Sequence, residues 1–310
     1  MKPSLSLSSA CLALLGVLAW IASATPARTE TYKVVITTSE GVGAFNSTLS
    51  GTNVMTFDDM QGIYTDYAWQ GVGVFDRLNV IRPNVYGGAP SEASPSGTNY
   101  AVEGLGSVRQ TILYLDQASS YFGLYWSAGD AANNLQFYSN EQLVANFTTN
   151  NLMNLLPRSY FGNPVTTGPY AGGNTREPYG FINFFGDENT SWDTIVFTNT
   201  STSGFEADNY TTRTEGWKPA EDGALPGTPA VVVQSEDGAQ TVAKITSVTV
   251  APDYSLEVTA VDVSTGITSM LSFAPAAPAA PAPPLAVLAA FGAALALKSL
   301  RRKKAPELNA

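Results

Sequence analysis

The stretch "YFGLYWSAGDAANNLQFYSNEQLVANFT", residues 121–148, decides the fold class. It holds three short runs rich in aromatic and β-branched residues, which clusters of Gly, Asp and Asn separate. None of the runs keeps a helical 3.6-residue period. The first run is apolar on both faces, as in the middle of a sheet, whereas the last alternates and predicts one buried face. The stretch therefore predicts three strands.

Comparable runs lie on both sides of this stretch, between clusters of turn-forming residues. They begin at Tyr32, Asn53, Arg109, Phe181, Asp193 and Phe205. Such spacing predicts an all-β fold over residues 28–215, built as an antiparallel β-sandwich or jelly roll. Residues 78–99 and 157–178 are rich in Pro and Gly and predict two long loops. In sandwiches, loops of this kind gather at the ends and carry binding sites.

The composition changes at residues 216–230, "GWKPAEDGALPGTPA", which have the Pro and Gly of a linker. Beyond them, four runs rich in Val and Thr have the pattern of strands. Residues 216–273 are therefore predicted to be a linker and an additional β segment. This segment either forms a small unit of its own or adds strands to the main sandwich.

Residues 1–27 have the features of a secretory signal peptide. Lys2 supplies a positive charge, residues 10–21 form an apolar run, and small residues follow it. Cleavage is expected after Ala24 or Ala27. The body of the protein is thus expected to be exported.

The other end of the chain has the features of a short membrane segment. Residues 274–284 are almost entirely Ala and Pro and predict an extended spacer. Residues 285–300 predict a transmembrane helix, although its uninterrupted apolar run has only 13 residues and a bilayer usually takes about 20. Residues 301–310 form a basic tail. The cations expected to hold the cytoplasmic side are Arg301, Arg302, Lys303 and Lys304.

The exported part is strongly acidic. Residues 28–273 hold ten Lys and Arg against 25 Asp and Glu, a net charge of −15. Nucleic acids and anionic lipids are bound mainly by clustered cations, so nucleic acid is not expected as a partner.

Two residue types that carry much of protein chemistry are missing. The chain has no histidine, and its single cysteine, Cys11, lies in the signal peptide. Disulfides, thiol nucleophiles, Ser-His-Asp triads and histidine metal sites are therefore excluded from the exported body. Calcium bound by oxygen ligands, or a carboxylate pair of the glycosidase type, stays chemically open.

Calcium is the candidate cofactor. Glu206 and Asp208 lie two apart, so in a strand they point to one face. Asp58 and Asp59 are expected in an early strand, and in many jelly rolls the first and last strands are neighbours. Converging carboxylates could hold Ca²⁺. The alternative is an acidic strand face, or an aspartate that fixes a loop by hydrogen bonds.

Aromatic residues give two kinds of candidate for carbohydrate binding. The first is a stacking platform in the aromatic run, but a place in the core is the favoured interpretation of these side chains: Tyr121, Phe122, Tyr125 and Trp126. Trp69 and Tyr86, in turn-rich surroundings, are the better candidates for exposed aromatics. An acid and base for glycoside hydrolysis could come from Glu103, Glu177, Glu206 or Asp208, yet carboxylates are so common on an acidic surface that an enzyme is not favoured.

Residues 121–148 and 179–213, the latter "YGFINFFGDENTSWDTIVFTNTSTSGFEADNYTTR", together resemble a cyanobacterial family of exosortase-dependent surface proteins. The likeness lies in the "YFGLYW" strand, the "FINFF" strand and the closing "FEADN" strand. The C-terminus is similar to a PEP-CTERM tail, with Pro281, Ala282 and Pro283 as the sorting motif. Ala282 stands where that motif usually has glutamate.

The resemblance implies an exosortase-type enzyme as processing partner and release into, or attachment to, the extracellular polysaccharide layer. We therefore expect an exported, non-catalytic protein of the cell surface or extracellular matrix, anchored in the membrane by its C-terminal helix before processing. The alternative is a lectin-like carbohydrate-binding module, with or without bound calcium. A polysaccharide-active enzyme is the third hypothesis.

Overall fold

The computed structural model describes residues 31–38, 41–104, 108–150, 152–153, 156–222, 229–236, 239–250, 256–262 and 268–273. The predicted signal peptide with Ala24 and Ala27, the spacer with its motif Pro281 to Pro283, the helix at 285–300 and the basic tail lie outside these residues. Within the described part of the chain, no helix is long and apolar enough to cross a membrane.

Nearly all regular structure in the described residues is strand, which confirms the all-β prediction. The strands are β1 (Thr31–Thr38), β2 (Asn53–Met55), β3 (Gly62–Trp69), β4 (Gly73–Ile81), β5 (Tyr100–Glu103), β6 (Gln110–Ser119), β7 (Tyr121–Ser127), β8 (Asn133–Ser139), β9 (Gln142–Thr148), β10 (Gly180–Gly186), β11 (Trp192–Asn199), β12 (Phe205–Arg213), β13 (Pro229–Glu236), β14 (Ala239–Val250), β15 (Leu256–Asp262) and β16 (Thr268–Phe273). Two short helices accompany them, η2 (Arg158–Tyr160) and α2 (Pro219–Asp222).

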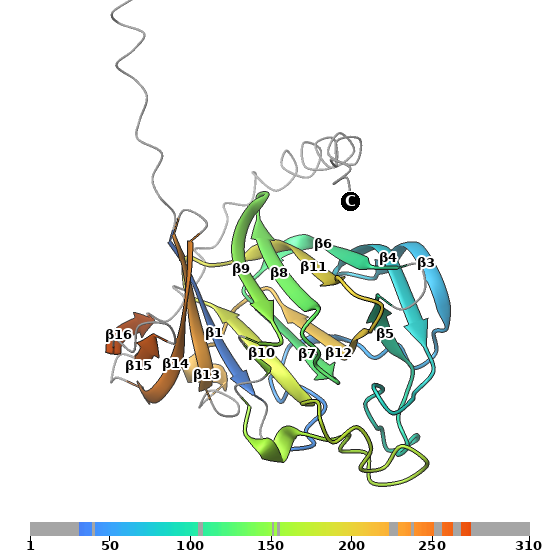
Figure 1. Ribbon diagram of the computed structural model, residues 1–310. Helices are drawn as coiled ribbons and strands as arrows, with labels where there is room; N and C mark the ends of the chain where they lie inside the picture. Colours follow the sequence, from blue (N-terminus) through green and yellow to red (C-terminus); the bar gives the residue numbers. More distant parts are fainter. Residues whose placement is uncertain are drawn as a thin grey trace, which may run out of the picture. The chain divides into compact units, whose positions relative to one another are not determined.

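The described strands form one antiparallel sheet in the order β16-β15-β14-β13-β1-β10-β7-β12-β5-β4-β6-β11-β8-β9, with β2 paired to β12 and β3 to β4. The sheet curls, so that β9, at one end of this path, comes to lie beside β1 (Figure 1). Asn140 and Glu141 join β8 to β9 with φ of 48° and 69°, which suits the tight turn of a two-residue hairpin.

The curl brings the aromatic faces of distant strands together. Phe122 on β7 contacts Phe137 on β8 and Phe197 on β11, with ring centroids 6.0 Å apart in each pair. Phe184 on β10 similarly meets Phe147 on β9 at 5.0 Å. These side chains are fully buried. The apolar faces of these strands therefore pack across the interior as well as against neighbouring strands, as Phe137 on β8 does with Phe147 on β9 at 5.8 Å.

The strand "YFGLYW" lies in the middle of the sheet, as predicted, between β10 and β12. All seven residues of β7 are buried. One face packs into the core and the other lies under long loops, where Tyr125 and Phe181 form a second apolar cluster with Tyr179. The core interpretation of Tyr121, Phe122, Tyr125 and Trp126 is confirmed, because none is more than 2% exposed.

Three strands, β3, β4 and β5, were not predicted. The expected strand at residues 53–59 ends at Met55, and the predicted loop at 78–99 begins only after Ile81. Most of β3 is exposed, since it pairs only with β4 among the described strands. A strand at such an edge lacks the clear apolar alternation on which the sequence pattern depends.

The four strands predicted after residue 229 are all present, as β13 to β16. They do not pair only among themselves: β13 pairs antiparallel with β1, with Val34 opposite Val233 and Val35 opposite Val232. The additional strands therefore extend the main sheet and do not form a small unit of their own.

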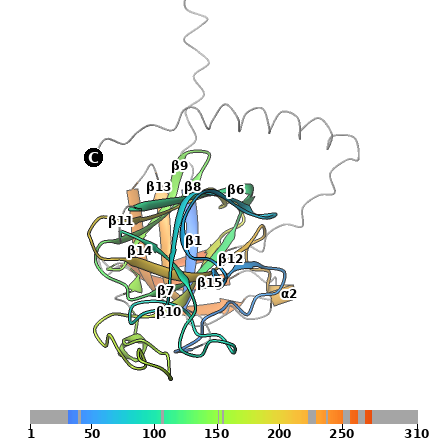
Figure 2. The ribbon, with the colours of Figure 1, turned by 90° about the vertical axis from the view of Figure 1, so that its right-hand side faces the viewer.

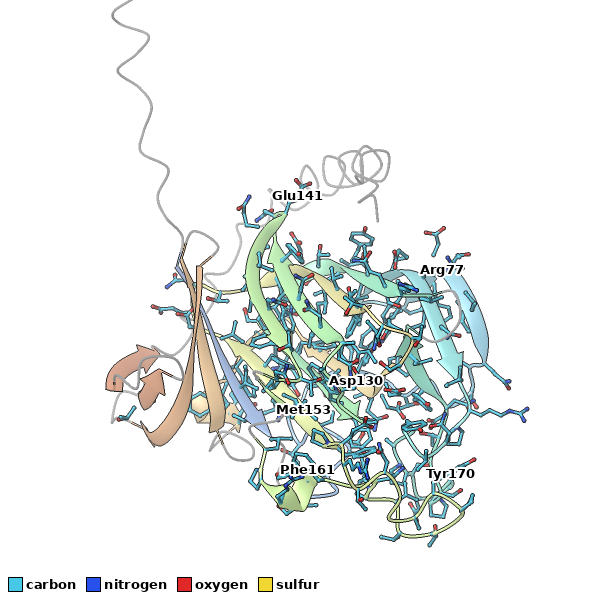
Figure 3. The ribbon with its side chains drawn as sticks, in the orientation of Figure 1. Arg77, Asp130, Glu141, Met153, Phe161 and Tyr170 are labelled. Atoms are coloured by element: carbon cyan, nitrogen blue, oxygen red, sulfur yellow. The ribbon has the colours of Figure 1, made fainter. Side chains whose placement is uncertain are left out.

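The long loops of the body gather at one end of the strands. Residues 41–52, 82–99 and 157–178 lie together in the lower part of Figures 1 and 2. Figure 3 places Phe161 and Tyr170 at this end and Glu141, at the tip of the β8–β9 hairpin, at the opposite one. The predicted clustering of loops is therefore found.

Candidate functional site

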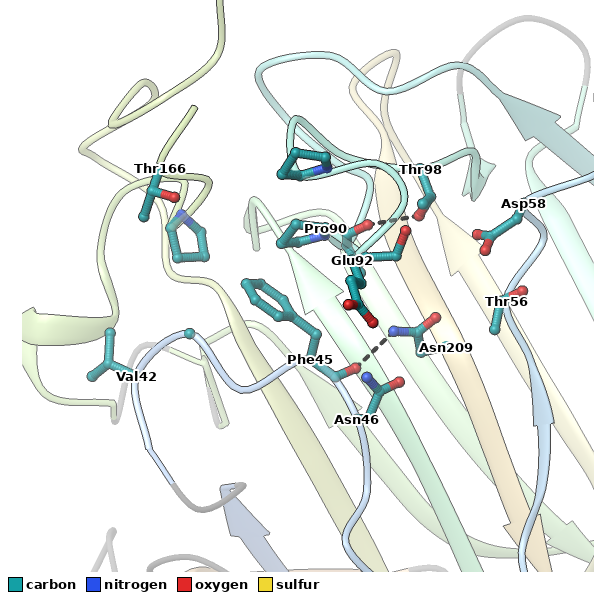
Figure 4. Close-up of a pocket in the computed structure, with 15 residues that line it drawn as sticks. Val42, Phe45, Asn46, Thr56, Asp58, Pro90, Glu92, Thr98, Thr166 and Asn209 are labelled. Carbon is teal, nitrogen blue, oxygen red and sulfur yellow. Dashed lines mark hydrogen bonds between the residues drawn. The ribbon is translucent and has the colours of Figure 1, made fainter. Parts of the chain in front are cut away.

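The loop end contains a cleft of about 810 Å³. Four loops and strand β12 contribute to it, so its walls come from segments far apart in the sequence (Figure 4). The side chains that decide its chemistry are Phe45, Asn46, Thr56, Asp58, Glu92, Thr98 and Asn209. Its volume falls within the roughly 300–1,000 Å³ usual for ligand pockets.

The loop at residues 82–99 is held by a buried carboxylate beneath it. Asp208 on β12 accepts a hydrogen bond from the backbone N–H of Ala89 at 2.8 Å and one from the Thr98 hydroxyl at 3.2 Å. The single proton of the Thr98 hydroxyl is shared between this contact and a shorter one of 2.6 Å to the Ala89 carbonyl (Figure 4). Gly88, with φ of 99°, makes this close approach possible, because a Cβ there would collide with the Thr98 carbonyl.

A second loop, residues 41–52, is fixed to the same strand through Phe45. Its carbonyl accepts a hydrogen bond from the Asn209 side-chain amide at 2.8 Å. Its ring packs against that of Tyr125, with centroids 5.1 Å apart and planes at 71°. Asn209 has φ of 51° and lies where the register of β12 shifts, so a bulge turns its amide toward the loop. The half-buried ring of Phe45 is thus held in one orientation at the cleft.

Asp58 is the better-organised of the two cleft carboxylates. It follows β2 in a turn. The Asn99 side-chain amide fixes this turn, because it donates to the backbone carbonyls of Asp58 at 3.1 Å and Met60 at 2.8 Å. Partial burial raises the pKa of Asp58 above its ordinary value, and hydrogen bonds with the Thr98 and Thr56 hydroxyls oppose this effect. The carboxylate therefore stands at the cleft surface as a positioned hydrogen-bond acceptor.

The charge of the cleft has one sign. Among the described residues that line it, Asp58 and Glu92 are the ionisable ones, and none is Lys or Arg. Amide and hydroxyl groups supply most of the remaining polar surface, and Phe45 with Pro90, Pro95 and Pro164 supplies the apolar surface. An anionic ligand would meet repulsion here without a compensating cation.

The four residues predicted to converge on calcium do not form one group. Asp58 and Asp59 lie in a turn, not in a strand as expected. The early strand β2, which precedes this turn, pairs with β12, which carries Glu206 and Asp208, although β12 is not the last strand of the sheet. Asp208 contacts the Thr98 hydroxyl at 3.2 Å. Among the described residues, no three His, Cys, Asp or Glu are grouped as metal ligands. Asp208 instead matches the alternative interpretation, an aspartate that fixes a loop.

Glu206 lies on the same strand as Asp208 but in different surroundings. It is buried, and burial raises its pKa to about 9, with the nearby carboxylates of Asp130 and Glu177 adding to the effect. Glu103 is fully buried, and burial raises its pKa to about 8. None of the four carboxylates that could supply an acid and a base lines the cleft. They are Glu103, Glu177, Glu206 and Asp208.

The two predicted exposed aromatics have opposite outcomes. Trp69 is buried, because its ring stacks on Phe75 with planes 7° apart and forms part of the core. The prediction of an exposed Trp69 is therefore wrong. Tyr86 is 48% exposed, as expected, but it does not line the cleft.

The aromatic residue of the cleft, Phe45, was missed. It stands in the Gly-rich stretch "GVGAF", residues 41–45. An aromatic residue in a turn-rich segment was the signal applied to Trp69 and Tyr86, and it would have found Phe45 as well. Asn209 and Thr98 carried no such signal, because nothing in their neighbourhood in the sequence indicates a shared cleft.

The chain matches no known protein-family model, no curated protein and no solved structure.

Proposed function

We propose that the chain is an exported, non-catalytic protein of the cell surface or extracellular matrix, whose β body presents a binding cleft. The single observation that carries the proposal is the order of segments: a signal peptide, a β body, a Pro/Ala spacer, a short apolar run and a basic block. The curled sheet with its face-to-face core supports a β-sandwich of the jelly-roll type as the body.

In this proposal the C-terminal segment is a temporary anchor. The apolar helix at residues 285–300 and the cations at 301–304 hold the chain in the membrane until an exosortase-type enzyme cuts near Pro281, Ala282 and Pro283. The short apolar run supports this role, because a permanent span usually takes about 20 residues. The resemblance to PEP-CTERM proteins supports the same order of events.

Mass spectrometry of the mature protein tests the proposal. We expect a new N-terminus after Ala24 or Ala27, and a new C-terminus within residues 281–284, in protein from the envelope and the medium. A double variant with Pro281→Ala and Pro283→Ala should keep residue 310, whereas Pro275→Ala, earlier in the same spacer, should be cut normally. A C-terminus at Ala310 in every fraction of the unmodified protein would refute the sorting role.

A second candidate function is carbohydrate binding of the lectin type, with calcium as its candidate cofactor. The cleft favours it, because it combines an aromatic ring, amides and carboxylates at the end of a rigid β body. An enzyme is less well supported, since the buried carboxylates Glu103, Glu206 and Asp208 do not open into the cleft. Binding to glycans that is abolished by EDTA would support the calcium-dependent form.

A further inference from the structure

The cleft has the chemistry of a site for uncharged, polyhydroxylated ligands. Sugars present hydroxyl groups in the plane of the ring and an apolar C–H face on each side. Protein sites that hold them therefore need paired donors and acceptors together with a flat apolar surface. Phe45 supplies the flat surface, while Asp58, Asn46 and Asn209 supply the polar groups, and all four line the same cleft.

Phe45 is prepared for such a contact before any ligand arrives. Its ring is already fixed by Tyr125 on one side and its backbone by the Asn209 amide. A ligand that stacks on it loses little affinity to ordering the side chain, which is the general advantage of a pre-organised site.

Asp58 is likewise held in place. The Asn99 amide donates to its backbone carbonyl at 3.1 Å and to that of Met60 at 2.8 Å, which fixes the turn that carries it. Asp58 is exposed and lines the cleft, so its carboxylate oxygens can accept from a ligand hydroxyl. Hydrogen bonds to a charged acceptor are stronger than neutral ones, so this contact should contribute strongly to affinity.

The charges of the cleft select between neutral and acidic glycans. Asp58 and Glu92 line the same space, and its described lining contains no cation to pair with a uronate, sulfate or phosphate group. A glycan that carries such groups would lose its hydration without gaining a partner. The cleft is therefore complementary to the uncharged part of a polysaccharide.

We infer that the cleft binds a short segment of a neutral glycan directly, without a bridging metal ion, with Phe45 as the stacking surface and Asp58 as the principal acceptor. This inference rests on the proposed binding role of the cleft and names its ligand. The volume of about 810 Å³ accommodates more than one sugar ring.

The test measures binding of the purified full-length protein to a panel of neutral hexose oligosaccharides and of uronic acid oligomers of equal length. We expect binding to at least one neutral oligosaccharide, none to the uronic acid oligomers, and no change on adding EDTA. Asp58→Asn should weaken binding about tenfold or more, which corresponds to about 1.4 kcal/mol. Phe45→Ala should have at least as large an effect.

Two matched controls separate a site from a general effect. Asp59→Asn removes the same charge one residue away, from an exposed position that does not line the cleft, and should leave the affinity unchanged. Tyr86→Ala removes an exposed aromatic outside the cleft and should also have no effect. Phe45→Ala also removes the packing of this ring against Tyr125, so the comparison of Asp58→Asn with Asp59→Asn decides.

Preference for the acidic oligomers, loss of binding with EDTA, equal affinities for Asp58→Asn and Asp59→Asn, or no binding to any neutral oligosaccharide would each overturn the inference. These outcomes are independent of the sorting role. A protein whose tail is cut near Pro281 but which binds no neutral glycan refutes the ligand alone. A protein that binds the glycan but keeps Ala310 refutes the sorting role alone.

Discussion

Replacing Asp222 with asparagine is expected to lower the free energy of unfolding by about 3–5 kcal/mol, because it leaves a buried guanidinium without its counter-ion. Asp222 ends α2 and pairs with Arg213 at the end of β12. Both carboxylate oxygens take part, with Nη1 to Oδ1 at 2.8 Å and Nη2 to Oδ2 at 2.7 Å. The side chains are only 6% and 1% exposed.

The surroundings of Arg213 explain why its counter-ion matters. The guanidinium also donates to the backbone carbonyls of Ser50, Glu215 and Gly216, so it joins three segments of the chain. Carbonyl groups satisfy its hydrogen bonds but do not neutralise its charge. With asparagine at position 222, the charge stays buried and one oxygen becomes an N–H₂ group that repels the donors of Arg213.

Urea unfolding followed by tryptophan fluorescence measures this effect. Glu221→Gln is the matched control, because Glu221 neighbours Asp222 in α2 but is 67% exposed and pairs with Lys218 at 3.4 Å. Exposed pairs of this kind contribute about 0–1 kcal/mol. A similar small loss for both variants would contradict the importance of the buried pair.

The pH dependence of this pair has a definite sign. Burial alone would raise the pKa of Asp222, but hydrogen bonds from Arg213 and the Lys218 N–H, with the charge of Arg213, hold it below its ordinary value. A carboxyl whose pKa is lowered on folding stabilises the protein above its unfolded pKa of about 3.9. The contribution is lost as the pH falls through the lowered value, so the Asp222→Asn variant should approach the wild type in stability at acidic pH.

The part of the fold that the sequence predicts well is the part with strong apolar periodicity. "YFGLYW" and "FINFF" are buried on both faces, and only a strand inside a covered sheet has that environment. The mostly exposed β3 lacks a continuous apolar face, and β5 has only four residues, so neither has a pattern that predicts a strand. Their positions depend on pairing with β4, which is a tertiary property.

The site was harder to predict than the fold because it depends on long-range contacts. Asp208 holds the Ala89 backbone across 119 residues of sequence, and Asn209 holds Phe45 across 164. The spacing of Glu206 and Asp208 correctly placed them in one strand. It could not reveal that Asp208 lies beneath a loop, where hydrogen bonds occupy it, whereas the exposed Asp58 lines the cleft.

The protein is expected to lose stability as the pH rises from about 5 to about 8, and Glu103→Gln should remove the share of that loss that belongs to Glu103. Glu103 lies on β5 opposite Phe205 of β12 and is fully buried. Burial raises its pKa to about 8; the Thr111 hydroxyl opposes this effect, and the charge of Asp76 adds to it. At neutral pH the folded protein therefore keeps this carboxyl protonated.

The sign follows from comparing the two states. In the unfolded chain a glutamate has a pKa of about 4.3, so between that value and about 8 the folded state holds a proton that the unfolded state has lost. Each pH unit in this window costs about 1.4 kcal/mol of stability, or on the order of 4 kcal/mol between pH 5 and pH 8. Below the window the contribution of Glu103 is fully present, and above it no further loss occurs.

Glutamine cannot ionise, so Glu103→Gln does not lose this stability. Between pH 5 and pH 8, the unfolding free energy of the variant should therefore rise relative to that of the wild type by on the order of 4 kcal/mol. The difference is the informative quantity, because burial also raises the pKa of Glu206 to about 9 and adds a slope of the same sign to both proteins. Urea unfolding at pH 5, 6.5 and 8 measures it.

Glu92→Gln, at an exposed position of the loop at residues 82–99, should show a constant difference. If Glu103→Gln behaves like Glu92→Gln across the three pH values, the buried carboxyl is already ionised in the folded protein, and some group near β5 must stabilise its charge.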